Sequence, residues 1–351
     1  MLRDSGYFKP LFDALNGRTG INDLEFNFDD FIPAIGNYYS VDGQFYSMPW
    51  NTSAPILYAN MNLLVEAGIA ENLEDMDAMA GTWTEIEEHC QIILEALDDV
   101  ACSYWRIDTW YLENSMAMAR EYLINNENGR AGRADEVILT SDAAIQLFEW
   151  WRRMLDEGYF IQYGANPGTA PASDFATGRV VYYAAASSAS IRTLNNALAE
   201  NNYIMGTNSL PYNPEWDYGS IGMGGATIYI SDGLAPEVEE AALTFLAFNV
   251  LPENDAAYHL EFGYVPVRPS TREILEADGW PLVFQAPVRQ FDAANLTNAV
   301  GPLLPTFLET RVIINEAMTA ILLDGAPILE TLQEAEADAT SLLQEYNLLV
   351  E

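Results

Sequence analysis

Short apolar runs separated by polar turns follow one another along this chain, with longer amphipathic stretches between them. Residues 44–48 and 55–59 have the aromatic and β-branched character of strands. Between them lies the polar turn Asn51-Thr52-Ser53, and a helical pattern over residues 60–67 follows. We therefore expect a strand that crosses from one lobe to another through a polar turn and leads into a helix.

Capping residues mark the starts of two long helices. Thr82 and Glu85 form a capping box, in which the threonine oxygen and the carboxylate satisfy free backbone amides at a helix start. The apolar spacing carries this helix to about Leu97. Ser141 is expected to cap a second helix that runs to Glu157 and is closed by the glycine after it.

The rest of the pattern alternates strands with helices. The expected elements are a short helix at 29–36, a helix end, turn and buried strand over 175–183, a strand at 226–230, an apolar helix at 236–249 and an amphipathic helix at 327–346. This alternation is typical of an α/β architecture.

Composition narrows the class of protein. The 351 residues suffice for two domains of ordinary size. Half of them are hydrophobic and 12% are aromatic, so large cores are expected rather than disorder. No apolar run reaches about 18 residues, so we expect no membrane span. The net charge of -37 argues against nucleic acid and anionic membrane surfaces as partners.

Cysteine and histidine are scarce. Cys90 and Cys102 can form one bridge, but we expect two buried free thiols. His89 and His259 are the only histidines, which argues against a zinc site or a histidine-based catalytic triad. The acidic residues show no spacing that selects a carboxylate pair for glycoside cleavage. We expect no metal, no cofactor and no enzymatic activity.

Three segments carry the small polar groups of a ligand site. Ser53 lies in the polar turn, which suits either a ligand loop or ordinary turn chemistry. Ser187 precedes a helical stretch, where hydroxyls and free amides form either an anion site or a plain cap. Gly225 belongs to a glycine-rich segment without nucleotide-binding spacing, which favours close approach of the backbone to another segment or to a small ligand.

Aromatic and cationic candidates have competing interpretations as well. Trp105 and Trp110 can form a platform for the C–H faces of a sugar or of glycerol, or they can pack in a core. Arg311 is a lone cation before apolar residues and needs an anionic partner. That partner is either a carboxylate such as Glu309 or Glu316, or a bound phosphate.

A series of motifs in register resembles the extracellular solute-binding proteins of family 1, the receptors that serve ABC importers. The matching segments are 43–60, Thr82-Trp83, 175–179, Gly224-Gly225, 252–254 and 263–266. The resemblance implies a hinged two-lobe fold of the periplasmic-binding-protein type, class II-like. It implies a first lobe from residues 1–50 and 222–267 and a second lobe from residues 51–221 and 268–351.

Within the family, the narrower resemblance is to receptors for sn-glycerol 3-phosphate. It implies a ligand-binding set of seven residues: Ser53, Ser187, Gly225, Tyr264, Arg311, Trp105 and Trp110. The implied function is capture of sn-glycerol 3-phosphate or a glycerophosphodiester for an ABC permease and its ATPase. The alternatives are an oligosaccharide receptor of the same family and, from a different class, an acidic secreted hydrolase.

The chain departs from the family pattern at its start. The family begins with a βαβα segment that builds most of the first lobe, and here the sequence starts where that segment ends. We therefore expect an incomplete first lobe. The resemblance also implies a monomer in the periplasm or outside the cell, either free or held by a lipid anchor, although residues 1–6 carry no secretion signal.

Overall fold

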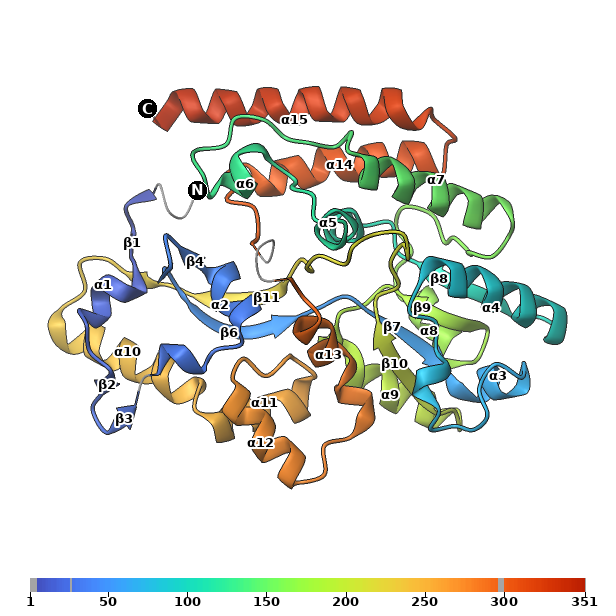
Figure 1. The fold of residues 1–351 in the computed structure, drawn as a ribbon, viewed down its shortest axis with the longest axis horizontal. Helices are drawn as coiled ribbons and strands as arrows, with labels where there is room; N and C mark the ends of the chain where they lie inside the picture. The colour runs from blue at the N-terminus through green and yellow to red at the C-terminus, as the bar shows by residue number, and fades with distance from the viewer. Residues whose placement is uncertain (1–4, 26, 296–299, 351) are drawn as a thin grey trace.

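The computed structural model describes residues 5–25, 27–295 and 300–350. The elements fall into two groups joined by long extended strands, with a helical layer along one side (Figure 1). The expected lobe limits at residues 1 and 351 lie outside the described residues. The lobe boundaries stay a prediction.

The strands are β1 (Phe8–Lys9), β2 (Gly20–Ile21), β3 (Leu24–Glu25), β4 (Ser40–Val41), β5 (Gln44–Phe45), β6 (Met48–Ser53), β7 (Ile56–Asn60), β8 (Ala101–Trp105), β9 (Val180–Ala184), β10 (Met205–Ser209), β11 (Gly224–Ile228) and β12 (Ile230–Ser231).

The helices are α1 (Leu11–Leu15), α2 (Pro33–Tyr39), α3 (Met61–Glu66), α4 (Trp83–Ala96), α5 (Thr109–Met118), α6 (Asn125–Gly129), α7 (Asp142–Asp156), α8 (Ala170–Ala176), α9 (Ile191–Glu200), α10 (Pro236–Asn249), α11 (Pro252–Phe262), α12 (Pro269–Ala277), α13 (Ala286–Asp292), α14 (Phe307–Leu322) and α15 (Ile328–Val350). Short 3-10 turns occur at Phe28–Asp30, Met76–Ala78, Ser188–Ser190 and Leu282–Phe284.

A four-stranded sheet forms the centre of one group, in the order β10-β7-β9-β8. β8 and β9 run parallel, whereas β7 is antiparallel to both β9 and β10. Every residue of β7 and β9 is buried, because helices such as α4, α8 and α9 pack against the sheet. The other group contains two-stranded pairs, of which β6 with β11 is the longest.

The helical layer is built from α7, α14 and α15 (Figure 1). α14 packs against α15, α7 and α5, so the C-terminal helices belong with the four-stranded sheet. α12 instead packs against α11. The expected boundary after residue 267 therefore runs between two helices that contact each other.

Local signals in the sequence agree with most of these elements. Thr82 and Glu85 form the expected capping box at the start of α4, and Ser141 caps α7. The short helix expected at 29–36 is instead a 3-10 turn followed by α2, which begins at Pro33 because proline suits the first helical position. The strand expected at 226–230 begins two residues earlier, at Gly224, and breaks after Ile228.

The expectation of two free thiols is wrong. Cys90 of α4 and Cys102 of β8 form a disulfide, with Cα atoms 5.1 Å apart. The helix packs directly on this strand, and the 12-residue separation lets the chain return to the same place. Both cysteines are fully buried. Such a bridge is typical of proteins outside the cytosol.

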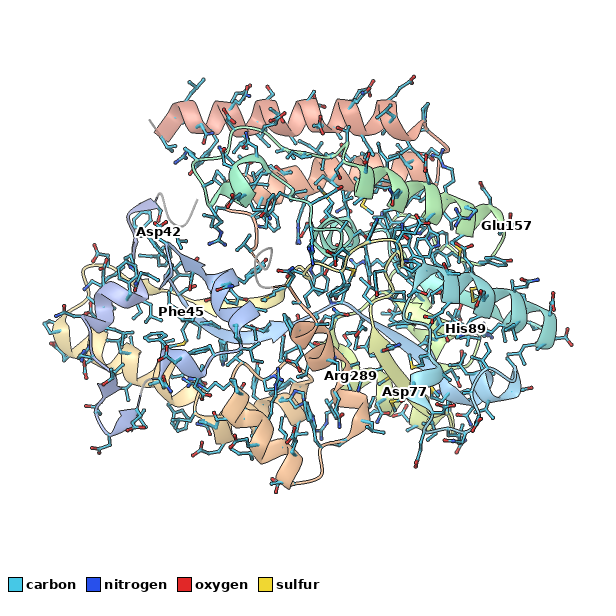
Figure 2. The ribbon with its side chains drawn as sticks, in the orientation of Figure 1. Asp42, Phe45, Asp77, His89, Glu157 and Arg289 are labelled. Carbon is cyan, nitrogen blue, oxygen red and sulfur yellow. A yellow bond between two sulfur atoms is a disulfide. The ribbon has the colours of Figure 1, made fainter. Side chains whose placement is uncertain are left out.

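Side chains fill the space between the elements on both sides; Asp42 and Phe45 belong to one group, and Asp77 and His89 to the other (Figure 2). His89 has a structural role: its Nδ1 lies 2.7 Å from the hydroxyl of Tyr182, inside the packing between α4 and β9. Burial lowers the pKa of His89. Within the described ranges no helix has the length and apolar character to cross a membrane, and no cluster of three potential metal ligands occurs.

Candidate ligand-binding site

The expected crossing between the two groups is present where β6 ends at Ser53 and β7 begins at Ile56. The Ser187 segment lies directly against it. Ser187 forms a β-bridge with Pro55, and the Ser188 amide donates to the Ala54 carbonyl at 2.9 Å. The first two expected serines are therefore neighbours, although 134 positions separate them in the sequence.

Glycine brings β11 against the same crossing. Gly225 pairs with Thr52 and has a φ of 100°, a conformation that side chains rarely adopt. A Cβ atom there would lie 1.6 Å from the Asn51 carbonyl oxygen. At Gly224 a Cβ atom would meet Ser53 Oγ at 2.7 Å and the Trp110 ring at 2.8 Å. Only glycine lets this strand approach so closely.

Tyr264 is fixed by its two neighbours in sequence. Gly263 sits so close to the Ser188 carbonyl that an added Cβ atom would lie 2.4 Å from its oxygen. The Val265 amide donates to the Thr52 carbonyl at 2.7 Å. Tyr264 therefore lies between the crossing strand and the serine segment, and its ring stacks on Tyr258 at 5.4 Å.

His259 supports the Tyr264 backbone, a role that the sequence did not indicate. Its Nδ1 donates to the Tyr264 carbonyl at 2.5 Å, and its Nε2 accepts from the indole N–H of Trp280 at 2.9 Å. Burial lowers the pKa of His259 to about 4. The imidazole is thus neutral at pH 7, with its tautomer set by these two partners.

Gln290 is a second supporting residue that sequence reasoning missed. This buried side chain on α13 accepts from the Leu210 amide at 2.6 Å and donates to the Pro55 carbonyl at 3.1 Å. It therefore joins the β6–β7 crossing to the segment that follows β10. A lone glutamine in an apolar helix carries no sequence signal for such a role.

Trp110 reaches the site from α5, whose start is capped by Asp108. Its indole N–H donates to the Gly222 carbonyl at 3.1 Å. Asn114, one turn further on, accepts from the Gly222 amide at 2.9 Å. α5 thus holds the strand that leads into β11, and the half-buried indole lies beside Gly224.

Trp105 does not lie with this group, and its position agrees with the alternative of core packing. It is the last residue of β8 and is only 1% exposed. Its ring packs among an aromatic cluster in the core: Tyr111, Trp150, Trp151 and Phe160. A tryptophan at the buried end of this edge strand packs in the core, and that position cannot be distinguished from a polar loop by residue type alone.

Arg311 has a carboxylate partner that differs from both expected ones. Its Nε and Nη2 donate to the two carboxylate oxygens of Glu113, each at 2.8 Å. The guanidinium also lies 4.4 Å from the centre of the Phe307 ring. Glu309 and Glu316 are exposed, because they point away from the face of α14 that packs on α5.

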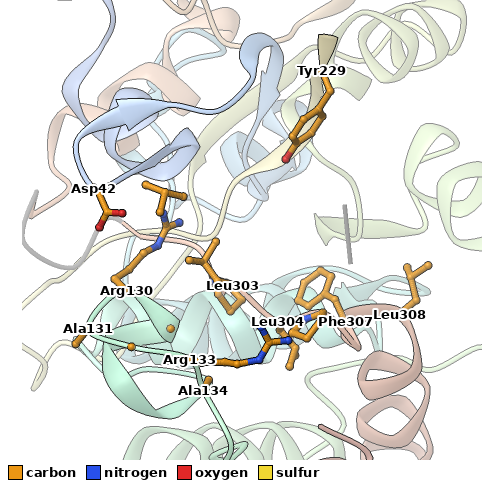
Figure 3. A pocket seen from close by; sticks show the side chains of 15 residues that line it. Asp42, Arg130, Ala131, Arg133, Ala134, Tyr229, Leu303, Leu304, Phe307 and Leu308 are labelled. Carbon is orange, nitrogen blue, oxygen red and sulfur yellow. The ribbon is translucent and has the colours of Figure 1, made fainter. Parts of the chain in front are cut away.

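A cavity of about 730 Å³ opens beside Phe307 (Figure 3). Its charged lining comes from Asp42 on one side and from Arg130 and Arg133 on the other. Of the described residues that line it, none belongs to the seven expected ones. Phe307 nevertheless contributes both to this cavity and to the packing of Arg311.

Together, these residues present hydroxyl groups, backbone amides, one guanidinium and aromatic faces around a crossing between two groups of elements. A few convergent polar groups beside aromatic surfaces are typical of small-molecule sites. The structure brings five of the seven expected residues to this crossing or to the strand beside it: Ser53, Ser187, Gly225, Tyr264 and Trp110. Arg311 lies on α14 and is joined through Glu113 to α5, the helix that carries Trp110.

Comparison with known sequences identifies relatives of the same kind. The sn-glycerol-3-phosphate-binding periplasmic protein of Pectobacterium atrosepticum is 22% identical over 352 aligned positions, which cover 96% of this chain and 74% of the relative. The corresponding protein of Yersinia pseudotuberculosis is 25% identical and covers 89% of this chain and 70% of the relative. These relatives are periplasmic binding proteins rather than enzymes.

Solved structures share the fold. UgpB of Mycobacterium tuberculosis in complex with glycerophosphocholine matches 98% of this chain and 81% of its own, with a TM-score of 0.71 and 22% identity. The GacH receptor of Streptomyces glaucescens, solved unliganded and with acarbose, matches 98% and 80%, with a TM-score of 0.76 and 16% identity. The two-lobe fold of the periplasmic-binding-protein type is thereby confirmed.

The model of one protein family, described as bacterial extracellular solute-binding protein, matches residues 2–284. That range includes the crossing at Ser53 and the segments that carry Trp110, Ser187, Gly225 and Tyr264. This chain therefore belongs to the bacterial extracellular solute-binding proteins, the ligand-capturing components of ABC importers.

Proposed function

We propose that this protein captures sn-glycerol 3-phosphate or a glycerophosphodiester between its two lobes and delivers it to an ABC permease. The proposed binding set consists of groups that hold the phosphate and rings that cover the glycerol: Ser53, Ser187, the Gly225 amide and Arg311 for the phosphate, and Tyr264 and Trp110 for the glycerol. The protein acts as a monomer in the periplasm or at the cell exterior, where a lipid anchor is one way of retention.

The convergence at the crossing is the observation that carries this proposal. Ser53, Ser187, Gly225 and Tyr264 come from four separate segments, and close backbone approaches hold all of them around residues 51–55. Relatives described as binding sn-glycerol 3-phosphate align along most of the chain, which supports the choice of ligand.

Ligand closure between lobes explains delivery to the permease. A ligand that contacts both lobes stabilises the closed state by its differential affinity for that state. The closed receptor then presents a different surface from the open one, and a permease can select it. The net charge of -37 does not prevent anion binding, because charges beyond about 8 Å are largely screened at physiological salt.

Isothermal titration tests the ligand. sn-Glycerol 3-phosphate and glycerophosphocholine are titrated into the protein, with maltose as comparator. We expect micromolar or tighter binding of a phosphate ligand. In the double variant Arg311→Ala/Glu113→Ala, which leaves no carboxylate unpaired, that binding should weaken at least tenfold, or about 1.4 kcal/mol. Unchanged phosphate binding in a folded double variant would contradict the proposed role of Arg311.

An oligosaccharide receptor is the second candidate. Receptors for sugars have equally similar folds, since the sugar-binding protein MalE of Xanthomonas citri matches with a TM-score of 0.75. The stacked rings of Trp50, Tyr258 and Tyr264 favour it as well, because aromatic faces suit sugar rings. Binding of maltose without either phosphate, unaffected by the double variant, would establish this candidate instead.

A further inference from the structure

The pairing of Arg311 bears on which phosphate ligands the site accepts. Two of the five N–H donors of its guanidinium go to the carboxylate of Glu113, in a bidentate arrangement at 2.8 Å. Glu113 also accepts from the Thr109 hydroxyl at 3.0 Å. The charge that would attract a phosphate is therefore already compensated by a side chain of the same protein.

The pair is too enclosed to separate easily. The Glu113 side chain is 10% exposed and the Arg311 side chain 33%. Phe307 covers one face of the guanidinium, and α5 and α14 pack against each other along the pair. Pulling Arg311 away would leave a buried carboxylate without its cation, which is strongly unfavourable. A ligand must therefore bind to Arg311 while Glu113 remains beside it.

This arrangement separates ligands by charge. A phosphomonoester carries nearly two negative charges at neutral pH, whereas a phosphodiester carries one. A dianion beside the Arg311–Glu113 pair faces a like charge at close range, and repulsion between like charges in a partly buried site is poorly screened. A monoanion or a neutral hydroxyl-bearing ligand uses the remaining N–H donors with much less repulsion.

We propose that Glu113 is a specificity-determining residue, which compensates Arg311 and makes the site prefer singly charged phosphodiesters over dianionic monoesters. The inference rests on the proposed function and narrows its ligand class. Space for the second alcohol of a diester exists nearby. Phe307, whose ring packs against the Arg311 guanidinium, also lines the cavity of about 730 Å³.

A matched pair of ligands isolates the charge. sn-Glycerol 3-phosphate and its methyl phosphodiester differ by one methyl group and about one negative charge. Both are titrated calorimetrically at pH 7.5 into the unaltered protein and into Glu113→Gln, which keeps the shape and an acceptor oxygen. We expect the unaltered protein to bind the diester at least tenfold more tightly. In Glu113→Gln the ratio of the diester affinity to the monoester affinity should fall about tenfold, mainly because the monoester binds more tightly.

Glu309→Gln is the control. Glu309 is exposed and lies on α14 two positions from Arg311, and its substitution removes the same charge as Glu113→Gln does. Its ratio should equal that of the unaltered protein. An unchanged ratio in Glu113→Gln, or equal weakening of both ligands, would overturn the inference while leaving the proposed function intact. Binding of neither phosphate ligand by any of the three proteins, with maltose bound, would overturn the proposed function and this inference with it.

Discussion

The two sides of the candidate site are built in different ways. On the strand side, Ser53, Ser187, Gly225 and Tyr264 are placed by backbone contacts and by glycines that have no room for a side chain. On the helix side, Trp110 and Arg311 are placed by side-chain hydrogen bonds from α5 and α14. The strand side is therefore rigid and intolerant of substitution, whereas the helix side can change its chemistry with little change of fold.

The largest expected effect comes from breaking the strand side. Gly225→Ala places a methyl group 1.6 Å from the Asn51 carbonyl oxygen, so β6 and β11 can no longer pair as they do. We expect a loss of more than about 4 kcal/mol in the free energy of unfolding, or no folded protein. Urea unfolding followed by circular dichroism measures it.

Gly233→Ala is the control for this change. Gly233 also has a positive φ, of 74°, but a Cβ atom there would meet nothing within 4 Å. It should lose only the conformational cost, about 1 to 2 kcal/mol. Equal losses in the two variants would show that the close approach of β11 contributes nothing, and the contrast between the two sides would fail.

The two tryptophans give the next largest effect. Trp105→Ala empties part of the aromatic core and should cost about 4 kcal/mol of stability. Trp110→Ala removes a half-buried ring and one hydrogen bond, so it should cost about 2 kcal/mol at most and should weaken ligand binding instead. Thermal unfolding and titration on both variants check this. If Trp105→Ala lowered the ligand affinity more than Trp110→Ala does, Trp105 would have to be counted among the ligand-binding residues.

Dependence on pH gives the smallest of these effects and concerns the strand side. Burial lowers the pKa of His259 to about 4, so unfolding takes up a proton below pH 6.5 and stability falls as the pH drops from 6.5 to 4. Burial raises the pKa of Asp255 to about 7, so its contribution is complete below pH 4 and is lost as the pH rises toward 7. The His259 contribution amounts to about 3 kcal/mol and the Asp255 contribution to about 4 kcal/mol, and they have opposite signs, so the net change in stability between pH 4 and pH 6.5 is small.

Asp255→Asn separates these contributions. The amide oxygen can still accept from the Val267 amide and the Thr271 hydroxyl, as the carboxylate does at 2.9 and 2.7 Å. With only His259 left, stability should rise by about 3 kcal/mol between pH 4 and pH 6.5. Urea unfolding at several pH values measures this slope. If the free energy of unfolding of the variant were as independent of pH as that expected for the unaltered protein, the buried Asp255 carboxyl could not be the group that offsets His259.

The same division explains what the sequence could predict. The crossing at residues 51–55, the capped helices and the glycines of β11 follow from local backbone preferences, which a short segment carries by itself. The Arg311–Glu113 pair joins residues 198 positions apart, and any of many acidic residues could have been the partner. Nothing in the spacing of Cys90 and Cys102 decided between a bridge and two thiols.

The features that the sequence could not predict depend on tertiary packing. Trp105 and Trp110 belong to one aromatic and polar stretch of sequence, yet Trp105 ends a buried strand, whereas Trp110 lies half-buried in the first turn of α5. That difference arises only when β8 is covered by α4 and α7 supplies Trp150 and Trp151. His259 and Gln290 were missed for the same reason, since their partners are carbonyl and amide groups of distant backbone.

Gln290 also has a mechanical consequence. Its amide ties the Pro55 carbonyl to the Leu210 amide, so two of the chain segments near the crossing cannot slide past each other without losing buried hydrogen bonds. Both segments border the paired strands β7 and β10, so the tie anchors this end of the crossing to the sheet, and backbone torsions on the other side of it would take up the relative motion of the lobes. This anchor point lies within the lobe that carries the four-stranded sheet, so closure would move the other lobe relative to a fixed attachment of the crossing strand.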